Sequence, residues 1–254
     1  GGGRGSGVVA GEFCRPYRTE VGLPFFALSH PRFMEDDVAY WLKVAGCLEV
    51  TMGVESATPA MRKDLLQRPE SDAEILAACD SCRKHDLRFS LDHLINLPRE
   101  TEEHHRDALA FYNRLRPDSL NVYPLQYYPG VDITETACRE GIVSAEMREQ
   151  IGEGKAGGSM VIGVGGTDPF DKAGSMAWLR FLLTALPFLP SSAIEIVIRR
   201  GWYKKKIQPP MMLFAVLKIL TKIRVHRLYV YLGIVSQTLR QIGESLRWKV
   251  GVRA

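Results

Sequence analysis

Residues 88–126, RFSLDHLINLPRETEEHHRDALAFYNRLRPDSLNVYPLQ, decide the fold. The pattern predicts a strand over 88–97, a helix over 101–115 that Pro117 ends, and a second strand over 119–126. A strand, a helix and another strand joined by short turns form the unit from which parallel sheets are built. This stretch therefore predicts two parallel strands with a crossover helix between them.

The same alternation extends upstream. Apolar runs predict strands over 23–28 and 48–54, and helices are expected over 35–45, ended by Gly46, and over 61–66. Ser71 and Glu74 form a capping box that opens a further helix. These units fill roughly half of an eight-stranded barrel of about 250 residues. We expect an α/β protein with a partial (β/α) TIM-like barrel of parallel strands, or an open sheet.

The two ends of the chain carry different patterns. Residues 1–13 are glycine-rich and are expected to form a loop or a frayed end. We assign 1–150 to the partial barrel, 151–172 to a glycine-rich linker and 173–254 to a basic helical C-terminal region, with helices over 176–186, 192–203 and 211–246. Residues 199–254 hold thirteen Lys and Arg and one acidic residue, Glu244, whereas residues 1–198 are net acidic.

Composition limits the class of protein. The 254 residues are 46% hydrophobic and 24% charged, as in an ordinary globular chain with a sizeable core. Five irregularly spaced cysteines indicate no disulfide framework, and no signal peptide or membrane-spanning run is recognisable, so a cytoplasmic setting is expected. Cys79 and Cys82 lie at i and i+3 on a helix without further ligands at zinc spacing, which favours core packing; no metal ligands are assigned.

Four sequence blocks together resemble the radical S-adenosylmethionine (radical SAM) superfamily. They are PFFALSHPRFMEDDVAYWLKVAGCLEVTMGVESAT, LLQRPES, LDHLINLPRET and LQYYPGVDI, within residues 14–145. They are most similar to the branch that usually carries an upstream cobalamin-binding domain. Methylthiotransferases and porphyrin-directed radical SAM enzymes share some of these blocks and are the alternatives within the superfamily.

The resemblance implies a set of S-adenosylmethionine (SAM) ligands. Glu55 and Asp92 would meet ribose hydroxyls or the amino group, Arg68 would grip the methionyl carboxylate with two parallel hydrogen bonds, and Leu125 would contact adenine through its backbone. The alternatives are a helix-capping Glu55, a solvent-exposed Arg68, an Asp92 paired within the sheet and a Leu125 in the core. Asn96 replaces a family glycine, and asparagine tolerates a left-handed backbone. His30 ends the first strand and is expected to be structural or to face the substrate.

The chain departs from the family in one respect. No Cys-x3-Cys-x2-Cys run occurs in it, and such thiolates would hold the [4Fe–4S] cluster. We therefore expect a fragment whose intact parent uses SAM and a [4Fe–4S] cluster for radical chemistry, or cobalamin for methyl transfer, and which is inactive alone. The alternative is a degenerate barrel that binds a ligand or partner without catalysis. The substrate would be a small or lipid-like molecule; nothing indicates nucleic acid, and catalytic residues are not assigned.

We predict that residues 199–254 give the protein weak, salt-sensitive affinity for anionic membranes. Basic residues near an anionic surface each contribute about 1 kcal/mol, and salt screens them. The intact chain should co-sediment with anionic vesicles at low salt more than a chain ending at Ile198 does. Equal sedimentation would identify the tail as a cap packed on the barrel.

Overall fold

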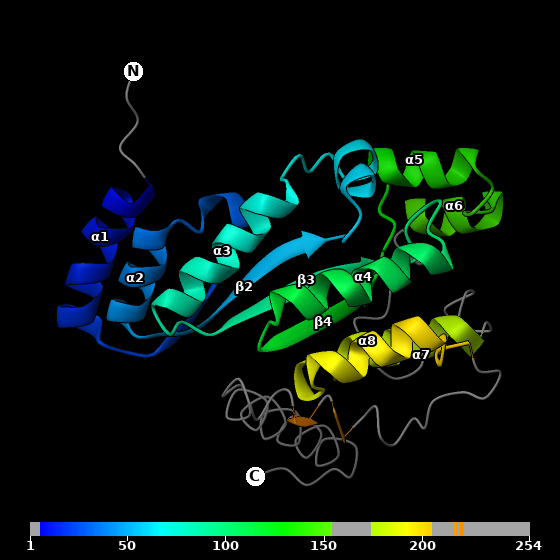
Figure 1. Ribbon diagram of the computed structural model, residues 1–254. Coiled ribbons are helices and arrows are strands. Elements are labelled where there is room, and N and C mark those ends of the chain that lie inside the picture. Colours follow the sequence, from blue (N-terminus) through cyan, green and yellow to red (C-terminus); the bar gives the residue numbers. More distant parts are fainter. Residues whose placement is uncertain (1–5, 154–173, 205–215, 218, 221–254) are drawn as a thin grey trace, which may run out of the picture.

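The computed structural model describes residues 6–153, 174–204, 216–217 and 219–220. Within these residues four strands form one parallel sheet in the order β1-β2-β3-β4 (Figure 1). The strands are β1 (Phe25–Ser29), β2 (Cys47–Glu55), β3 (Phe89–Ile95) and β4 (Ser119–Pro124). The predicted α/β class is confirmed, because parallel strands that neighbour one another in chain order are the arrangement of a (β/α) barrel.

Helices connect the strands where the sequence predicts them. They are α2 (Asp36–Ala45), α3 (Asp72–Lys84) and α4 (Glu102–Leu115), with short helical turns at η2 (Pro31–Phe33) and η3 (Met61–Leu65). Strand residues of one parity, such as Val50, Met52 and Leu91, share a single hydrophobic core with Ile75 of α3 and Leu109 of α4. Burial of this apolar surface holds the helices on the sheet.

Local chemistry sets the helix ends. The capping box at Ser71 is present, with the Ser71 backbone N–H donating to the Glu74 carboxylate at 2.7 Å. Gly46 ends α2 in the left-handed region with φ 96°, as predicted. The helix α4 ends at Arg116, which itself adopts φ 43°, before Pro117 is reached.

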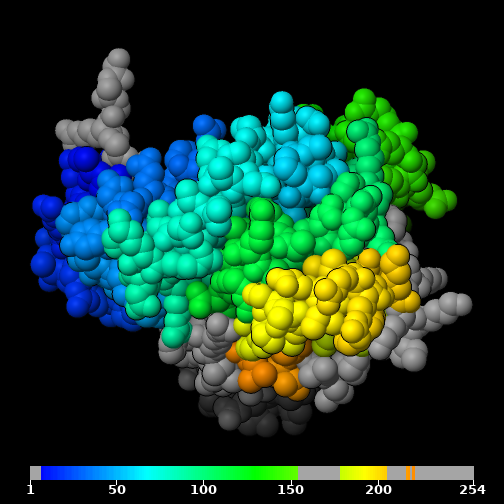
Figure 2. Space-filling model, in the orientation of Figure 1, coloured from blue at the N-terminus to red at the C-terminus, as the bar shows by residue number. Residues whose placement is uncertain are grey.

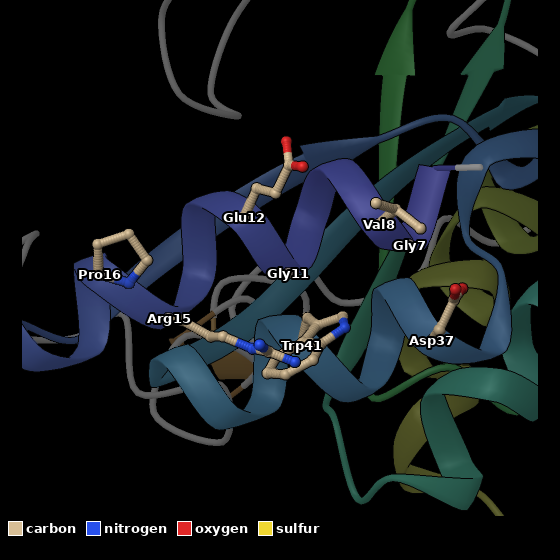
Figure 3. A pocket seen from close by; sticks show the side chains of 8 residues that line it. All are labelled: Gly7, Val8, Gly11, Glu12, Arg15, Pro16, Asp37 and Trp41. Carbon is tan, nitrogen blue, oxygen red and sulfur yellow. The ribbon is translucent and has the colours of Figure 1, made fainter. Parts of the chain in front are cut away.

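The prediction for residues 1–13 is wrong for the part that the structure describes. Residues 6–16 form α1 (Ser6–Pro16), which continues into η1 (Tyr17–Val21). Gly7 and Gly11 of α1 allow this helix to approach α2 closely. A Cβ on Gly11 would stand 2.9 Å from the Trp41 ring, and a Cβ on Gly7 would overlap the Asp37 side chain. Figure 3 shows Arg15 beside the Trp41 ring, 4.5 Å from its centroid. The glycines serve close helix packing rather than flexibility.

The C-terminal half adds four α-helices and one short 3-10 helix among its longer described elements. The helices α5 (Asp132–Arg139) and α6 (Ala145–Gly152) and the 3-10 helix η4 (Leu186–Phe188) were not predicted, whereas α7 (Gly174–Ala185) and α8 (Ser191–Arg200) follow the expected helices. Leu183 and Ile194 belong to the same core as the strands, and Figure 2 shows α8 lying against α4. No described helix combines the length and the hydropathy needed to cross a bilayer. The predicted linker and most of the 211–246 helix lie outside the described residues.

We predict that Gly11→Leu destabilises the protein and that Gly152→Leu does not. Leucine favours helix over glycine at both positions, but only at Gly11 does the added Cβ meet a neighbour. Overpacking should lower the free energy of unfolding by about 1–3 kcal/mol at Gly11. Urea denaturation of both variants measures the difference, and equal stability would show that the α1–α2 contact tolerates a side chain.

Candidate functional site

One face of the sheet is polar although it is buried. The strand register places Thr51 opposite Ser90, and Asp92 opposite both Gly53 and Asn121. Because side chains alternate along a strand, these residues share a face, and the core residues of opposite parity face the helices. The polar face consists of Glu49, Thr51, Gly53, Ser90, Asp92, Ser119 and Asn121. A buried polar face requires hydrogen-bond partners, which ligand groups can supply as well as protein groups.

Glu55 and Arg68 meet where β2 ends. The Arg68 Nη1 donates to Glu55 Oε1 at 2.9 Å and to the Gly53 carbonyl at 2.9 Å. Glu55 has φ 65°, so its side chain leaves the regular alternation of β2. A Cβ on Gly53 would stand 3.0 Å from Arg68 Nη1 and would overlap the Glu55 carboxylate. Glycine at this position therefore makes room for the pair.

Asp92 and Leu125 lie on the two neighbouring strands. Asp92 accepts a hydrogen bond of 2.8 Å from the Asn121 side chain, and its charge acts on Glu55. Burial raises the pKa of the Glu55 carboxyl, Arg68 lowers it and Asp92 raises it, and the net result is a raised pKa. The Leu125 backbone N–H donates to the Ile95 carbonyl at 2.8 Å. The structure thus brings Glu55 and Arg68 into contact, with Asp92 near them and Leu125 just beyond β4.

Two residues complete this edge: Glu70, which the sequence did not single out, and His30, which the sequence placed at the end of the first strand. Glu70 is buried, and its carboxylate lies 3.7 Å from Arg68 Nε and 3.4 Å from His30 Nε2. His30 accepts a hydrogen bond from the Arg32 backbone at Nδ1, which begins η2. Burial lowers the pKa of His30, so its imidazole is largely neutral at pH 7. Glu70 lies in the short segment between η3 and α3, where no hydrophobic period marks it.

The turn after β3 is held by side chains. Asn96 adopts φ 64°, which confirms that asparagine is accommodated here in the left-handed region. The Glu100 carboxylate accepts from the Asn96 backbone N–H at 2.6 Å and from that of Leu97 at 3.3 Å. Arg180 of α7 donates to the Asn96 side chain. Glu100 and Arg180 of α7 therefore both hold the turn that follows β3.

A second polar cluster lies on the helix side of β3. Ligand atoms of His93, Glu100 and His105 all lie within 4.8 Å of one another, and we call these three residues the histidine cluster. Burial lowers the pKa of His93 to about 3. Its Nδ1 lies 3.0 Å from the Tyr112 hydroxyl. The spacing of these residues in the sequence does not predict the cluster, because its members come from a strand, a turn and a helix.

The described cysteines do not fit a cluster of iron and sulfur. Cys79 and Cys82 are buried in the core, as predicted, and burial raises the pKa of each thiol to about 12.

A polar cleft of about 560 Å³ lies between η3 and α5 and is lined by Gln67, Arg99 and Asp132, among others. None of the four predicted SAM ligands lines it.

Among known proteins, the chain is similar to solved structures only. No protein-family model and no curated protein matches the chain. Coproporphyrinogen III oxidase from Escherichia coli, a radical SAM enzyme, is similar with a TM-score of 0.46 and 19% identity over 58% of this chain and 35% of that one. The radical SAM methyltransferase TsrM from Kitasatospora setae, with cobalamin and a [4Fe–4S] cluster bound, gives 0.45 and 16% over 54% and 28%. Its structure with tryptophan and a SAM analogue gives 0.46 and 16% over 54% and 27%.

The chain therefore spans 35% or less of the length of these solved structures.

We predict opposite pH effects for Glu55→Gln and Glu74→Gln. The pKa of Glu55 is raised on folding, so its contribution to stability is present at low pH and is lost as the pH rises through the folded value. The pKa of Glu74 is lowered, mainly by the Ser71 backbone N–H, so its contribution is lost as the pH falls. From about pH 7 to about pH 4, the stability of the wild type should rise relative to Glu55→Gln and fall relative to Glu74→Gln.

Urea denaturation of the three proteins at each pH measures both differences. If the Glu55→Gln difference moved in the same direction as the Glu74→Gln difference, Arg68 rather than burial would control the Glu55 charge.

Proposed function

We propose that this chain is the part of a radical SAM enzyme that grips SAM. The observation that carries the proposal is the Glu55–Arg68 pair at the end of β2, beside Asp92 on the buried polar face. In sheets of parallel strands, ligands bind at the carboxyl ends of the strands. The proposal also draws on the sequence resemblance, which assigned the same residues.

The charges of this edge suit SAM. The carboxylates of Glu55 and Glu70 both lie against the Arg68 guanidinium, and the Asp92 carboxylate acts on Glu55. The edge is therefore acidic, and a ligand with a sulfonium and an ammonium group would be attracted to it. Arg68 would receive the methionyl carboxylate, and because its Nη1 already donates to Glu55 and to the Gly53 carbonyl, the ligand would take the place of the Glu55 contact to form two parallel hydrogen bonds.

Each residue then has a defined task. Glu55 and Asp92 are hydrogen-bond acceptors, so they would hold the ribose hydroxyls or the amino group of SAM. Glu70 would orient Arg68, because its carboxylate lies 3.7 Å from the Arg68 Nε, whereas Glu55 contacts Nη1. The Leu125 segment, tied to β3 through the Ile95 carbonyl, would lie along the adenine.

The chemistry of the intact parent belongs to groups that this part does not hold. A [4Fe–4S] cluster would supply the electron that cleaves SAM, and cobalamin would serve if the reaction is methyl transfer. The described cysteines cannot ligate that cluster, so we propose no step through it and expect this chain alone to be inactive. Its own residues bind and orient SAM.

We predict that the chain binds SAM weakly. The Arg68→Lys variant should lower the affinity for SAM about tenfold, which corresponds to a loss of about 1.4 kcal/mol of binding free energy. The same variant should leave 5′-methylthioadenosine unaffected, because that ligand lacks the carboxylate. Asp92→Asn should weaken both ligands, since both carry the ribose. Titrations followed by NMR measure each affinity.

Arg106→Lys is the matched control, because Arg106 is an exposed arginine of α4 that pairs only with surface acids among the described residues. It should change neither affinity. Absence of binding at millimolar SAM, or an equal loss of both ligands in Arg68→Lys, would contradict the proposal.

A further inference from the structure

The histidine cluster holds buried ring nitrogens that make no hydrogen bond in the described part of the chain; of these, His105 Nε2 has a contact of 3.2 Å with Glu100 Oε2. His93 and His105 are 2% and 0% exposed. Neither His93 Nε2 nor either ring nitrogen of His105 makes a hydrogen bond within the described residues. Such buried unpaired groups are rare in proteins and call for an explanation, of which a bound ion is one.

The Tyr112 contact can fix the His93 tautomer. If the His93 Nδ1–H donates to the Tyr112 hydroxyl, 3.0 Å away, then Nε2 carries a lone pair. Metal-binding histidines commonly use one ring nitrogen for the metal and donate the other N–H in this way. In that tautomer His93 has the arrangement of a ligand with its supporting hydrogen bond.

The other two members complete a ligand set. His105 Nε2 lies 3.2 Å from Glu100 Oε2, and the side chain of Glu100 is 6% exposed. Two imidazoles and one carboxylate form a known protein ligand set for Zn²⁺.

We propose that His93, Glu100 and His105 bind one Zn²⁺ ion, which clamps the turn between β3 and α4. The three ligands come from β3, from the turn and from α4, so one ion would cross-link all of them. The Asn96 backbone within that turn is left-handed, and a clamp would hold it in place. The proposal does not rest on SAM binding. Three protein ligands leave the fourth position of a tetrahedral ion for water, and the position of the ligands on β3, the turn and α4 assigns the ion to holding these elements together.

The test uses the tag-free 254-residue chain, refolded from denaturant in a thiol-free reductant with Zn²⁺ or Co²⁺. Refolding is needed because the buried ligands are accessible only before the fold closes. We expect about one metal per chain by elemental analysis, as for a single site. The Co²⁺ form should show a tetrahedral visible spectrum that Zn²⁺ abolishes. The melting temperature should rise by several degrees with Zn²⁺.

Two variants and two controls identify the ligands. His93→Gln and His105→Gln should each lower the affinity for Co²⁺ at least tenfold. His104→Gln should bind as the wild type does, because glutamine preserves the capping box that His104 makes with Thr101 on the same helix. The double variant Cys79→Ala, Cys82→Ala should also bind normally, since these thiols lie in the core.

X-ray absorption of the Zn²⁺ form of the wild type needs no variant and should show imidazole and oxygen ligands without sulfur. The proposal is overturned if the refolded chain binds no metal, if His93→Gln and His105→Gln bind as tightly as the wild type, or if sulfur ligates the ion. In the first case the histidine cluster is a buried polar group without an ion.

Discussion

The carboxyl edge of the sheet depends on the hydrogen bonds and ion pairs that the Arg68 guanidinium makes. This guanidinium joins the end of β2, through Gly53 and Glu55, to Glu70 in the segment that leads into α3. Glu70 is buried, and a buried carboxylate is strongly unfavourable without a cation beside it. The absence of a side chain at Gly53 lets the guanidinium reach the strand. One small residue, one cation and two acids thus fix the geometry at which the chain would meet a ligand.

The sequence predicted the fold where local chemistry and hydrophobic period agree. The capping box at Ser71 and the left-handed Gly46 were both found as expected, and each limits a helix by its own backbone hydrogen bonds. The prediction for residues 1–13 was wrong because glycine is a signal for loops when read locally. In α1 the reason for Gly7 and Gly11 is the neighbouring helix α2, which no local pattern reveals.

The candidate site was predictable in part for a similar reason. Glu55 and Asp92 end or interrupt apolar strands, and parallel strands bring such positions to one edge. The alternation of Glu49, Thr51 and Gly53 with apolar residues was visible in the sequence and would have indicated the polar face. Glu70 offered no such signal, because its importance comes from a contact across the chain with Arg68.

Because side chains alternate along β3, the adjacent residues Asp92 and His93 lie on opposite faces of the sheet, a carboxylate on one face and an imidazole on the other. Asp92 faces Asn121 on the polar face, whereas His93 faces Tyr112 and His105 on the helix side. A shift of β3 by one residue would exchange these faces, placing a carboxylate among the apolar side chains of α4 and an imidazole on the polar face. The hydrogen bonds that each residue makes on its own side therefore oppose such a slip from both faces. The same contacts that supply acceptors for a ligand on one side and imidazoles for an ion on the other also fix the register of the strand between them.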